Sequence, residues 1–357
     1  MPADHPNGLR LSVLDQSPIR TGQTPGEAIR ETLQLAQAAD RLGYHRYWLA
    51  EHHSTPGLAD AAPEILIGAV AAETRRIRVG SGGVMLTHYS PLKVAEQFRM
   101  LETLHPGRID LGIGRAPGSD ARTALALRRG ADAARGPSVP DPWAETEIAR
   151  FPEQVGALIG FLTNALPADH RFSSVHAMPS GERAPEIWLL GSTDASAACA
   201  AHFGTGFSFA HFINADGGAA VTRAYARAFR PSLTLSAARA SVAVFAVCAD
   251  TEAEAERLSR SRDLFIVRLY TGRSGPYPSV DEAERYPYSP RELAIVEHAR
   301  QRTVAGAPEQ VQARLLALAG EYDVDELVVV TITHDPKARL RSYELLAEAF
   351  GLRGDPA

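Results

Sequence analysis

The sequence predicts a single-domain (β/α)₈ barrel, and three observations lead to this prediction. Short apolar runs alternate along the chain with longer amphipathic segments, and this strand-then-helix pattern recurs eight times. Strands that are separated by helices pair in parallel, because a helical crossover returns the chain to the end of the sheet at which the previous strand began. The 357 residues contain no clean linker, and barrels of this kind routinely exceed about 250 residues as one domain. A doubly wound open sheet is the alternative that periodicity alone leaves open.

Each strand is expected from a β-branched or apolar run, and each helix from an apolar stripe at helical spacing. The first helix has the clearest start, because Thr24, Pro25 and Glu27 supply an N-cap, a first-turn proline and a capping-box partner, and Gly43 ends it. The expected strands are Leu11–Gln16, Tyr47–Ala50, Ile77–Met85, Arg108–Gly114, Glu186–Leu190, Gly206–Phe209, Ser241–Val247 and Glu326–Ile332. The later helices are expected at Ala62–Thr74, Leu92–Leu104, Thr146–Leu166, Ala195–His202, Gly217–Ala228, Glu252–Leu269, Pro308–Leu318 and Pro336–Phe350.

Two long segments interrupt the alternation. Residues 116–144 follow the fourth strand and are rich in Ala, Gly, Pro and Arg, which predicts an extended loop. Residues 271–304 follow the seventh strand and its helix, and they carry several glycines and prolines. Loops of this length in a compact domain are usually functional lids or disordered, and both segments are expected on the face of the barrel where active sites lie.

The composition excludes several classes of protein. The net charge is −5, with 37 Lys and Arg against 42 Asp and Glu and no basic stripe, so nucleic acid is not an expected partner. Cys199 and Cys248 are the only cysteines, and no Cys or His cluster has metal-ligand spacing, so no metal is expected. The first ten residues are polar, and no apolar run approaches the ~20 residues of a membrane span. We therefore expect a cytoplasmic protein without membrane association.

Glu51, His52 and His53 end the second predicted strand. Adjacent histidines diverge at a strand end and rarely bind one ion, so a metal site is the weakest interpretation. A solvated strand end is a second one. The carboxyl ends of barrel strands carry the chemistry in this fold, and histidine titrates near neutrality. These three residues are therefore the candidates for acid/base catalysis.

Glycine motifs end the third and fourth strands. Ser81, Gly82 and Gly83 predict a bulge, because glycine inside a strand is costly unless the backbone bulges or approaches another group closely. The bulge either faces a flat ring or serves packing alone. Arg115 stands within Gly112–Gly118, where a guanidinium beside glycines suits an anionic group. A surface arginine in a turn is the alternative for Arg115.

A third candidate site lies where the fifth strand meets a helix of small residues. Ser192, Thr193 and Ser196 surround the expected helix start, where free N–H groups and the helix dipole suit a phosphate. Simple N-capping by Thr193 or Asp194 is the competing interpretation, and the two can coexist. No GxSxG, HExxH or GxxxxGK[ST] motif is present, so hydrolase and P-loop functions lack their signatures.

Taken together, these motifs resemble the bacterial luciferase-like flavin monooxygenases. The resemblance covers nearly the whole chain. It rests on the segments RYWLAEHH, TRRIRVGSGGVML, SPLKVAEQFRMLETLHPGRIDLGIGR, VAGAPEQV and DELVVV. It implies a barrel that binds reduced FMN at the carboxyl ends of its strands. The activity it implies is oxygenation of a small organic substrate with O₂, through a C4a-peroxyflavin.

The resemblance also implies roles for individual residues. His52 matches the family's acid/base, and His53 matches its neighbour in the cavity. Gly82 and Gly83 match a bulge under the flavin ring that often contains a non-proline cis peptide. Residues 271–304 correspond to the family's mobile lid. Arg115 matches an arginine that reaches the FMN phosphate, while Ser192, Thr193 and Ser196 fall in the region that receives this phosphate. Gly114 departs from luciferase itself, which has a cysteine there, and this counts against light emission.

The expected partners follow from the cofactor and from the helices. No nicotinamide-binding unit is evident, so a separate flavin reductase is expected to supply reduced FMN. A homodimer is expected through the helices after strands two and three, because Ala62–Thr74 is apolar on more than one face. A deazaflavin (F420) oxidoreductase and a non-catalytic flavin-binding protein are the alternative functions. The arginine-rich composition is associated with organisms in which such enzymes tailor aromatic polyketides in antibiotic biosynthesis.

Overall fold

The strands form a closed parallel barrel, as the sequence predicts. The computed structural model describes residues 8–115, 120–129, 144–181 and 183–354. All strand pairs in this part of the chain are parallel, and the ring closes because β6 pairs with β7 as well as with β5. Around the barrel the order is β1-β2-β3-β4-β5-β6-β7-β9, with β8 outside the ring. The strands are β1 (Arg10–Asp15), β2 (Arg46–Leu49), β3 (Arg78–Met85), β4 (Ile109–Gly114), β5 (Glu186–Gly191), β6 (Gly206–Ala210), β7 (Ala240–Cys248), β8 (Thr303–Gly306) and β9 (Glu326–Val330).

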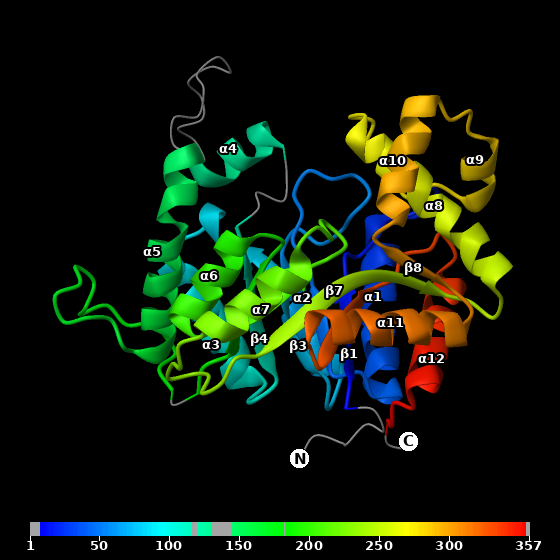
Figure 1. The fold of residues 1–357 in the computed structure, drawn as a ribbon. Coiled ribbons are helices and arrows are strands. Elements are labelled where there is room, and N and C mark those ends of the chain that lie inside the picture. The colour runs from blue at the N-terminus through cyan, green and yellow to red at the C-terminus, as the bar shows by residue number, and fades with distance from the viewer. Residues whose placement is uncertain (1–7, 116–119, 130–143, 182, 355–357) are drawn as a thin grey trace.

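Helices surround the barrel (Figure 1). The predicted capping box is present at the first of them, where Glu27 N–H donates to Thr24 Oγ1 at 3.3 Å and Thr24 N–H donates to Glu27 Oε2 at 2.8 Å. No helix in the described ranges is long and apolar enough to cross a membrane. The helices are α1 (Pro25–Leu42), α2 (Pro63–Glu73), α3 (Pro91–Leu104), α4 (Ala121–Arg129), α5 (Ala144–Thr163), α6 (Asp194–Phe203), α7 (Gly218–Ala228), α8 (Glu252–Tyr270), α9 (Val280–Arg285), α10 (Pro290–Arg300), α11 (Pro308–Tyr322) and α12 (Pro336–Phe350), with a 3₁₀ turn at Leu86–His88.

The two segments expected as loops contain regular structure. Residues 271–304 include α9, α10 and the start of β8, which pairs with the last residues of β7 from Phe245 to Cys248. The loop interpretation missed a capping box at Ser289 and Glu292 that starts α10. In the segment after β4, residues 121–129 form α4, and residues 116–119 and 130–143 lie outside the described residues. Figure 1 shows α8, α9 and α10 grouped over one end of the barrel.

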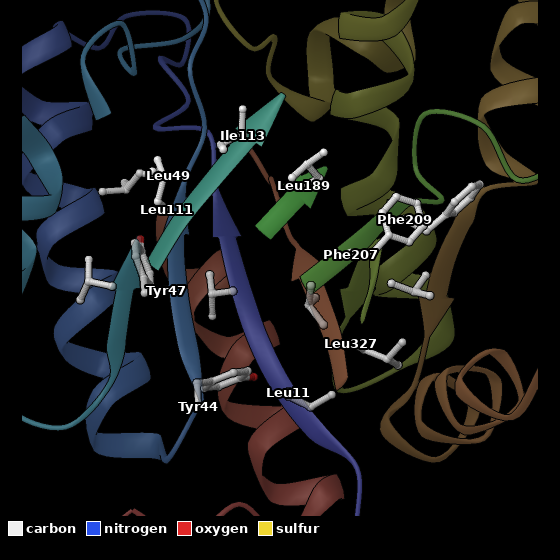
Figure 2. Packing of buried hydrophobic residues seen from close by; sticks show 14 of the residues in the cluster. Leu11, Tyr44, Tyr47, Leu49, Leu111, Ile113, Leu189, Phe207, Phe209 and Leu327 are labelled. Carbon is white, nitrogen blue, oxygen red and sulfur yellow. The ribbon is translucent and has the colours of Figure 1, made fainter. Parts of the chain in front are cut away.

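The main hydrophobic core lies between the strands and the helices. Figure 2 shows Leu11, Tyr47, Leu111, Phe207 and Leu327, all fully buried, which project from five different strands into this layer. Residues one position along each strand point into the barrel instead, because side chains alternate across a strand. This alternation fixes which residues can reach a site at the barrel mouth.

A buried ionic layer closes the barrel interior. The guanidinium of Arg46 lies 2.8 Å from Asp110, 3.0 Å from Glu186 and 2.8 Å from Glu326. Trp48 packs against the Trp188 ring directly beside this layer, with ring centroids 5.4 Å apart. Burial alone would raise the pKa of Glu186, but Arg46 and its other arginine partners lower it to about 2. The interior at this depth is therefore filled, and open space lies toward the carboxyl ends of the strands.

Candidate active site

Glu51 organises the residues that follow β2. Its carboxylate accepts hydrogen bonds from Met85 N–H at 3.0 Å and from Tyr89 Oη at 2.7 Å, and it lies 2.7 Å from His53 Nε2. The side chain is buried, so these contacts replace water around the carboxylate. Burial raises the pKa of Tyr89, and its hydrogen bond to Glu51 raises it further. Glu51 thus holds His53 in place and lines neither of the two cavities described below.

His52 is oriented by a different carboxylate. Its Nδ1 lies 2.8 Å from Oδ2 of Asp60, which is fully buried. Burial alone would lower the pKa of His52, but the charge and hydrogen bond of Asp60 raise it overall. Since Nδ1 is engaged, Nε2 is the ring nitrogen available to a ligand. A carboxylate that orients an imidazole is the arrangement used in general acid/base catalysis.

A cavity of about 250 Å³ lies against the bulge of β3. The register between β3 and β4 shifts between Ser81 and Val84, and the Gly82–Gly83 peptide bond is cis, as the resemblance implies. A Cβ at Gly82 would come 2.5 Å from Leu14, and one at Gly83 would come 2.6 Å from Leu190. Both leucines line this cavity, so a side chain at either glycine would displace its wall.

The start of α6 forms the polar end of this cavity. Arg115, Ser192, Thr193 and Ser196 all line it. Thr193 is the N-cap of α6, and its Oγ1 accepts a hydrogen bond from Ser196 N–H at 3.4 Å. Within the described ranges, no hydrogen bond or ion pair joins the Arg115 guanidinium to another residue, although its charge lowers the pKa of Cys199 against the stronger effect of burial. A free guanidinium beside a helix N-terminus suits a phosphate.

A second cavity of about 530 Å³ adjoins the first. Phe212 and Ile213, which follow β6, line both cavities. His52 and His53 line the larger one from the barrel side, and residues of α8 line it from above. A cavity of this volume lies within the range that accommodates a small organic molecule.

The structure thus brings most of the predicted residues together. His52 and His53 line the larger cavity, while Gly82, Gly83, Arg115, Ser192, Thr193 and Ser196 line the smaller one. Ser81 lines neither cavity, and its buried hydroxyl donates a hydrogen bond to Gly112 O at 2.8 Å. Among the described residues, no His, Cys, Asp and Glu side chains form a group of three that could hold a metal ion.

Sequence reasoning missed several residues of the site. Asp60 stands in a loop eight residues after His52, and nothing in the local pattern points back to the histidine. Tyr89 lies 38 residues from Glu51. Two further residues line the larger cavity: Phe212 from the loop after β6, and Arg262 from α8. The apolar periodicity of α8 was the one signal that could have suggested its cavity-facing side.

The fold is a closed parallel α/β barrel with two adjoining cavities, and similarity to known proteins gives the family. The model of the luciferase-like monooxygenase family matches residues 9–323, so the chain belongs to this family. YwcH of Bacillus subtilis, an uncharacterised protein, is 46% identical over 346 residues, covering 96% of the chain and 99% of the relative. N-acetyl-S-alkylcysteine monooxygenase of the same organism is 38% identical, with 96% and 98% covered. The luciferase-like monooxygenase of Escherichia coli is 40% identical, with 94% and 96% covered.

Solved structures agree with this assignment. The apo form of MsnO8 is 38% identical and superposes with a TM-score of 0.84, covering 98% of this chain and 99% of that one. The oxygenating component of 3,6-diketocamphane monooxygenase from Pseudomonas putida, solved in complex with FMN, has a TM-score of 0.66 at 20% identity, with 96% and 97% covered. The second match concerns the fold alone.

Proposed function

We propose that this protein is an FMN-dependent monooxygenase that uses reduced FMN and O₂ to oxygenate a small organic substrate. One observation carries the proposal: a glycine-walled cavity with a cationic, helix-capped end shares Phe212 and Ile213 with a larger cavity that contains two carboxylate-bound histidines. The first cavity suits a flavin and the second suits its substrate. A separate flavin reductase supplies the reduced cofactor in this proposal.

The residues of the smaller cavity fit the two ends of FMN. The phosphate would be held by Arg115 and by the hydroxyl and N–H groups at the start of α6. The ring would lie against the side-chain-free backbone at Gly82 and Gly83. The adjoining apolar side chains exclude water from this surface, and they are Leu14, Leu190, Ala243 and Val328.

The chain's own residues have separable tasks in this proposal. Reduced FMN, when bound, supplies the electrons that activate O₂. His52 holds or moves a proton at Nε2, and Asp60 keeps its ring in one orientation. Glu51 positions His53 through the contact between Oε1 and Nε2. The shared wall of Phe212 and Ile213 brings the substrate cavity next to the cofactor cavity.

The function is tested by supplying the protein with FMN, NADH and a flavin reductase, and by measuring oxygenated product and hydrogen peroxide. N-acetyl-S-benzylcysteine is the first substrate to assay, because a relative of 38% identity is an N-acetyl-S-alkylcysteine monooxygenase. Aromatic polyketides form the second panel. We expect ¹⁸O from ¹⁸O₂ in the product, while reduced F420 in place of reduced FMN should give none. Tight FMN binding with only peroxide across both panels would favour a flavin carrier.

We further propose that the protein is a homodimer through α2 and α3. Ile65 and Leu104 on these helices are 70% and 62% exposed, and the half-exposed Met100 and Met178 line a surface groove that includes residues of both helices. Light scattering should give a dimer mass at micromolar concentration, and Leu104→Glu should give a monomer. Leu233→Glu, at an exposed leucine away from these helices, is the matched control and should remain dimeric. A monomeric parent protein contradicts the proposal.

A further inference from the structure

One face of α8 forms a wall of the larger cavity. Arg262, Phe265, Ile266, Leu269 and Tyr270 all line it, and their spacing of three and four places them on a single side of the helix. Four of these side chains are apolar or aromatic. Arg262 is the exception, since it adds a positive charge to a surface that otherwise suits an uncharged ligand.

Arg262 has few partners for a buried guanidinium. It is only 5% exposed, its Nη1 donates to Thr303 Oγ1 at 3.0 Å, and its Cζ lies 4.0 Å from the Phe245 ring centroid. No carboxylate in the described ranges forms an ion pair with it, and the adjacent Asp263 pairs with Arg300 at 2.6 Å. A guanidinium carries five N–H donors, so most of its hydrogen-bonding capacity is left for a ligand.

Three other buried arginines in the described ranges are better compensated, whereas Arg302 donates only to the carbonyl of Ile213. Arg46 pairs with three carboxylates, Arg339 pairs with one carboxylate and a backbone carbonyl, and Arg99 donates to three carbonyls. Burial lowers the pKa of Arg262, and the nearby Tyr277 and Asp263 oppose this shift without cancelling it. A guanidinium nevertheless remains protonated in proteins. A buried charge without an oppositely charged partner is destabilising, and a bound anion offsets much of that effect.

We propose that the substrate carries a carboxylate and that Arg262 binds it. The proposal rests on the monooxygenase function and names its substrate class. The planar guanidinium matches a carboxylate with two parallel hydrogen bonds. The apolar part of the substrate then lies along Phe265, Ile266 and Leu269. Arg262 is on the substrate side, because it lines the larger cavity and is not part of the smaller one.

The test is a calorimetric binding comparison of carboxylates with their primary amides. The probes are N-acetyl-S-benzylcysteine, phenylacetate and decanoate, each beside its amide, titrated into the full chain. At least one carboxylate should bind the parent tenfold or more tightly than its amide. Arg262→Gln should weaken that carboxylate roughly 10- to 100-fold, as expected for loss of a charge-assisted contact, and should leave the amide within about threefold. Arg262→Lys keeps the positive charge but loses the planar guanidinium, so its affinity for the carboxylate should lie between those of the parent and Arg262→Gln.

Arg257→Gln is the matched control, because Arg257 lies on the same helix, is paired with Glu254 and is half exposed. It should bind every probe like the parent. The proposal is overturned if no carboxylate is preferred over its amide by the parent, or if Arg262→Gln weakens both members of a pair equally. FMN titration of the same proteins separates the two proposals: a carboxylate preference without FMN binding removes the flavin function alone, and FMN binding without that preference removes the role of Arg262 alone.

Discussion

Replacing Arg115 by alanine tests the phosphate end of the cofactor cavity most directly. The guanidinium lines the 250 Å³ cavity together with the start of α6. No hydrogen bond or ion pair ties it to the rest of the described chain, so its removal leaves no protein group without a partner. The variant should therefore fold with the parent's thermal stability, and any change in flavin affinity reports on the ligand contact itself.

The size of the effect follows from the kind of contact. A charge-assisted hydrogen bond contributes about 1.5–3 kcal/mol, and each 1.4 kcal/mol is a factor of ten in Kd, so FMN should bind roughly 10- to 150-fold more weakly. Riboflavin lacks the phosphate and should bind both proteins equally. Flavin fluorescence during titration measures both affinities. Added salt should weaken FMN binding to the parent more than to the variant, because it screens the contact that the variant lacks.

Arg122→Ala is the control for Arg115, since Arg122 is an exposed arginine on α4 outside both cavities. It should bind FMN like the parent. An equal loss of FMN and riboflavin affinity in Arg115→Ala would show that the residue shapes the cavity without contacting the phosphate. No loss for either flavin would place the phosphate elsewhere, and the assignment of α6 would then be wrong as well.

Three further outcomes are expected. His52→Ala should lower product formation at least ~100-fold and release hydrogen peroxide, while FMN still binds. His53→Ala should lower product formation less. Product formation at the parent rate in both variants would show that the two histidines have no catalytic role. Asp60→Asn should lower the pKa of His52, because burial is then opposed by the charge of Glu51 alone, and an unshifted NMR titration of this ring would refute that. Glu186 has a folded pKa of about 2 against 4.5, so it stabilises the fold above pH 4.5 and loses this effect as pH falls toward 2. Urea unfolding of Glu186→Gln should show a flatter acid limb, and a slope equal to the parent's would exclude this contribution.

The barrel could be predicted because its evidence is local. Most strands and helices are indicated by residue spacing and capping residues within a short stretch of sequence, as Thr24 and Glu27 indicate the start of α1. The same kind of signal was present at Ser289 and Glu292, and only the prolines and glycines around it led to the loop interpretation. Strand β8 is different, because its structure depends on pairing with β7, more than fifty residues earlier in the chain.

The sequence predicts which residues lie at the site, but it does not predict which side chains they contact. Residues that end neighbouring strands of a barrel lie at one rim, which is why motifs far apart in sequence converge on two adjoining cavities. The partners of those residues come from loops and helices whose placement depends on tertiary packing. Asp60 beside His52, Tyr89 beside Glu51, and Arg262 in the cavity wall have no local signature.

The arrangement of α8 separates two properties that an enzyme must otherwise change together. The groups assigned to the cofactor lie at the ends of β3, β4 and β5, while five side chains of one helix line the neighbouring cavity. Substitutions along that helical face can therefore alter which molecules the larger cavity accepts without changing the residues assigned to the cofactor. A lineage could diversify its substrates through this helix alone, and a library restricted to these five positions is a compact way to redirect the enzyme.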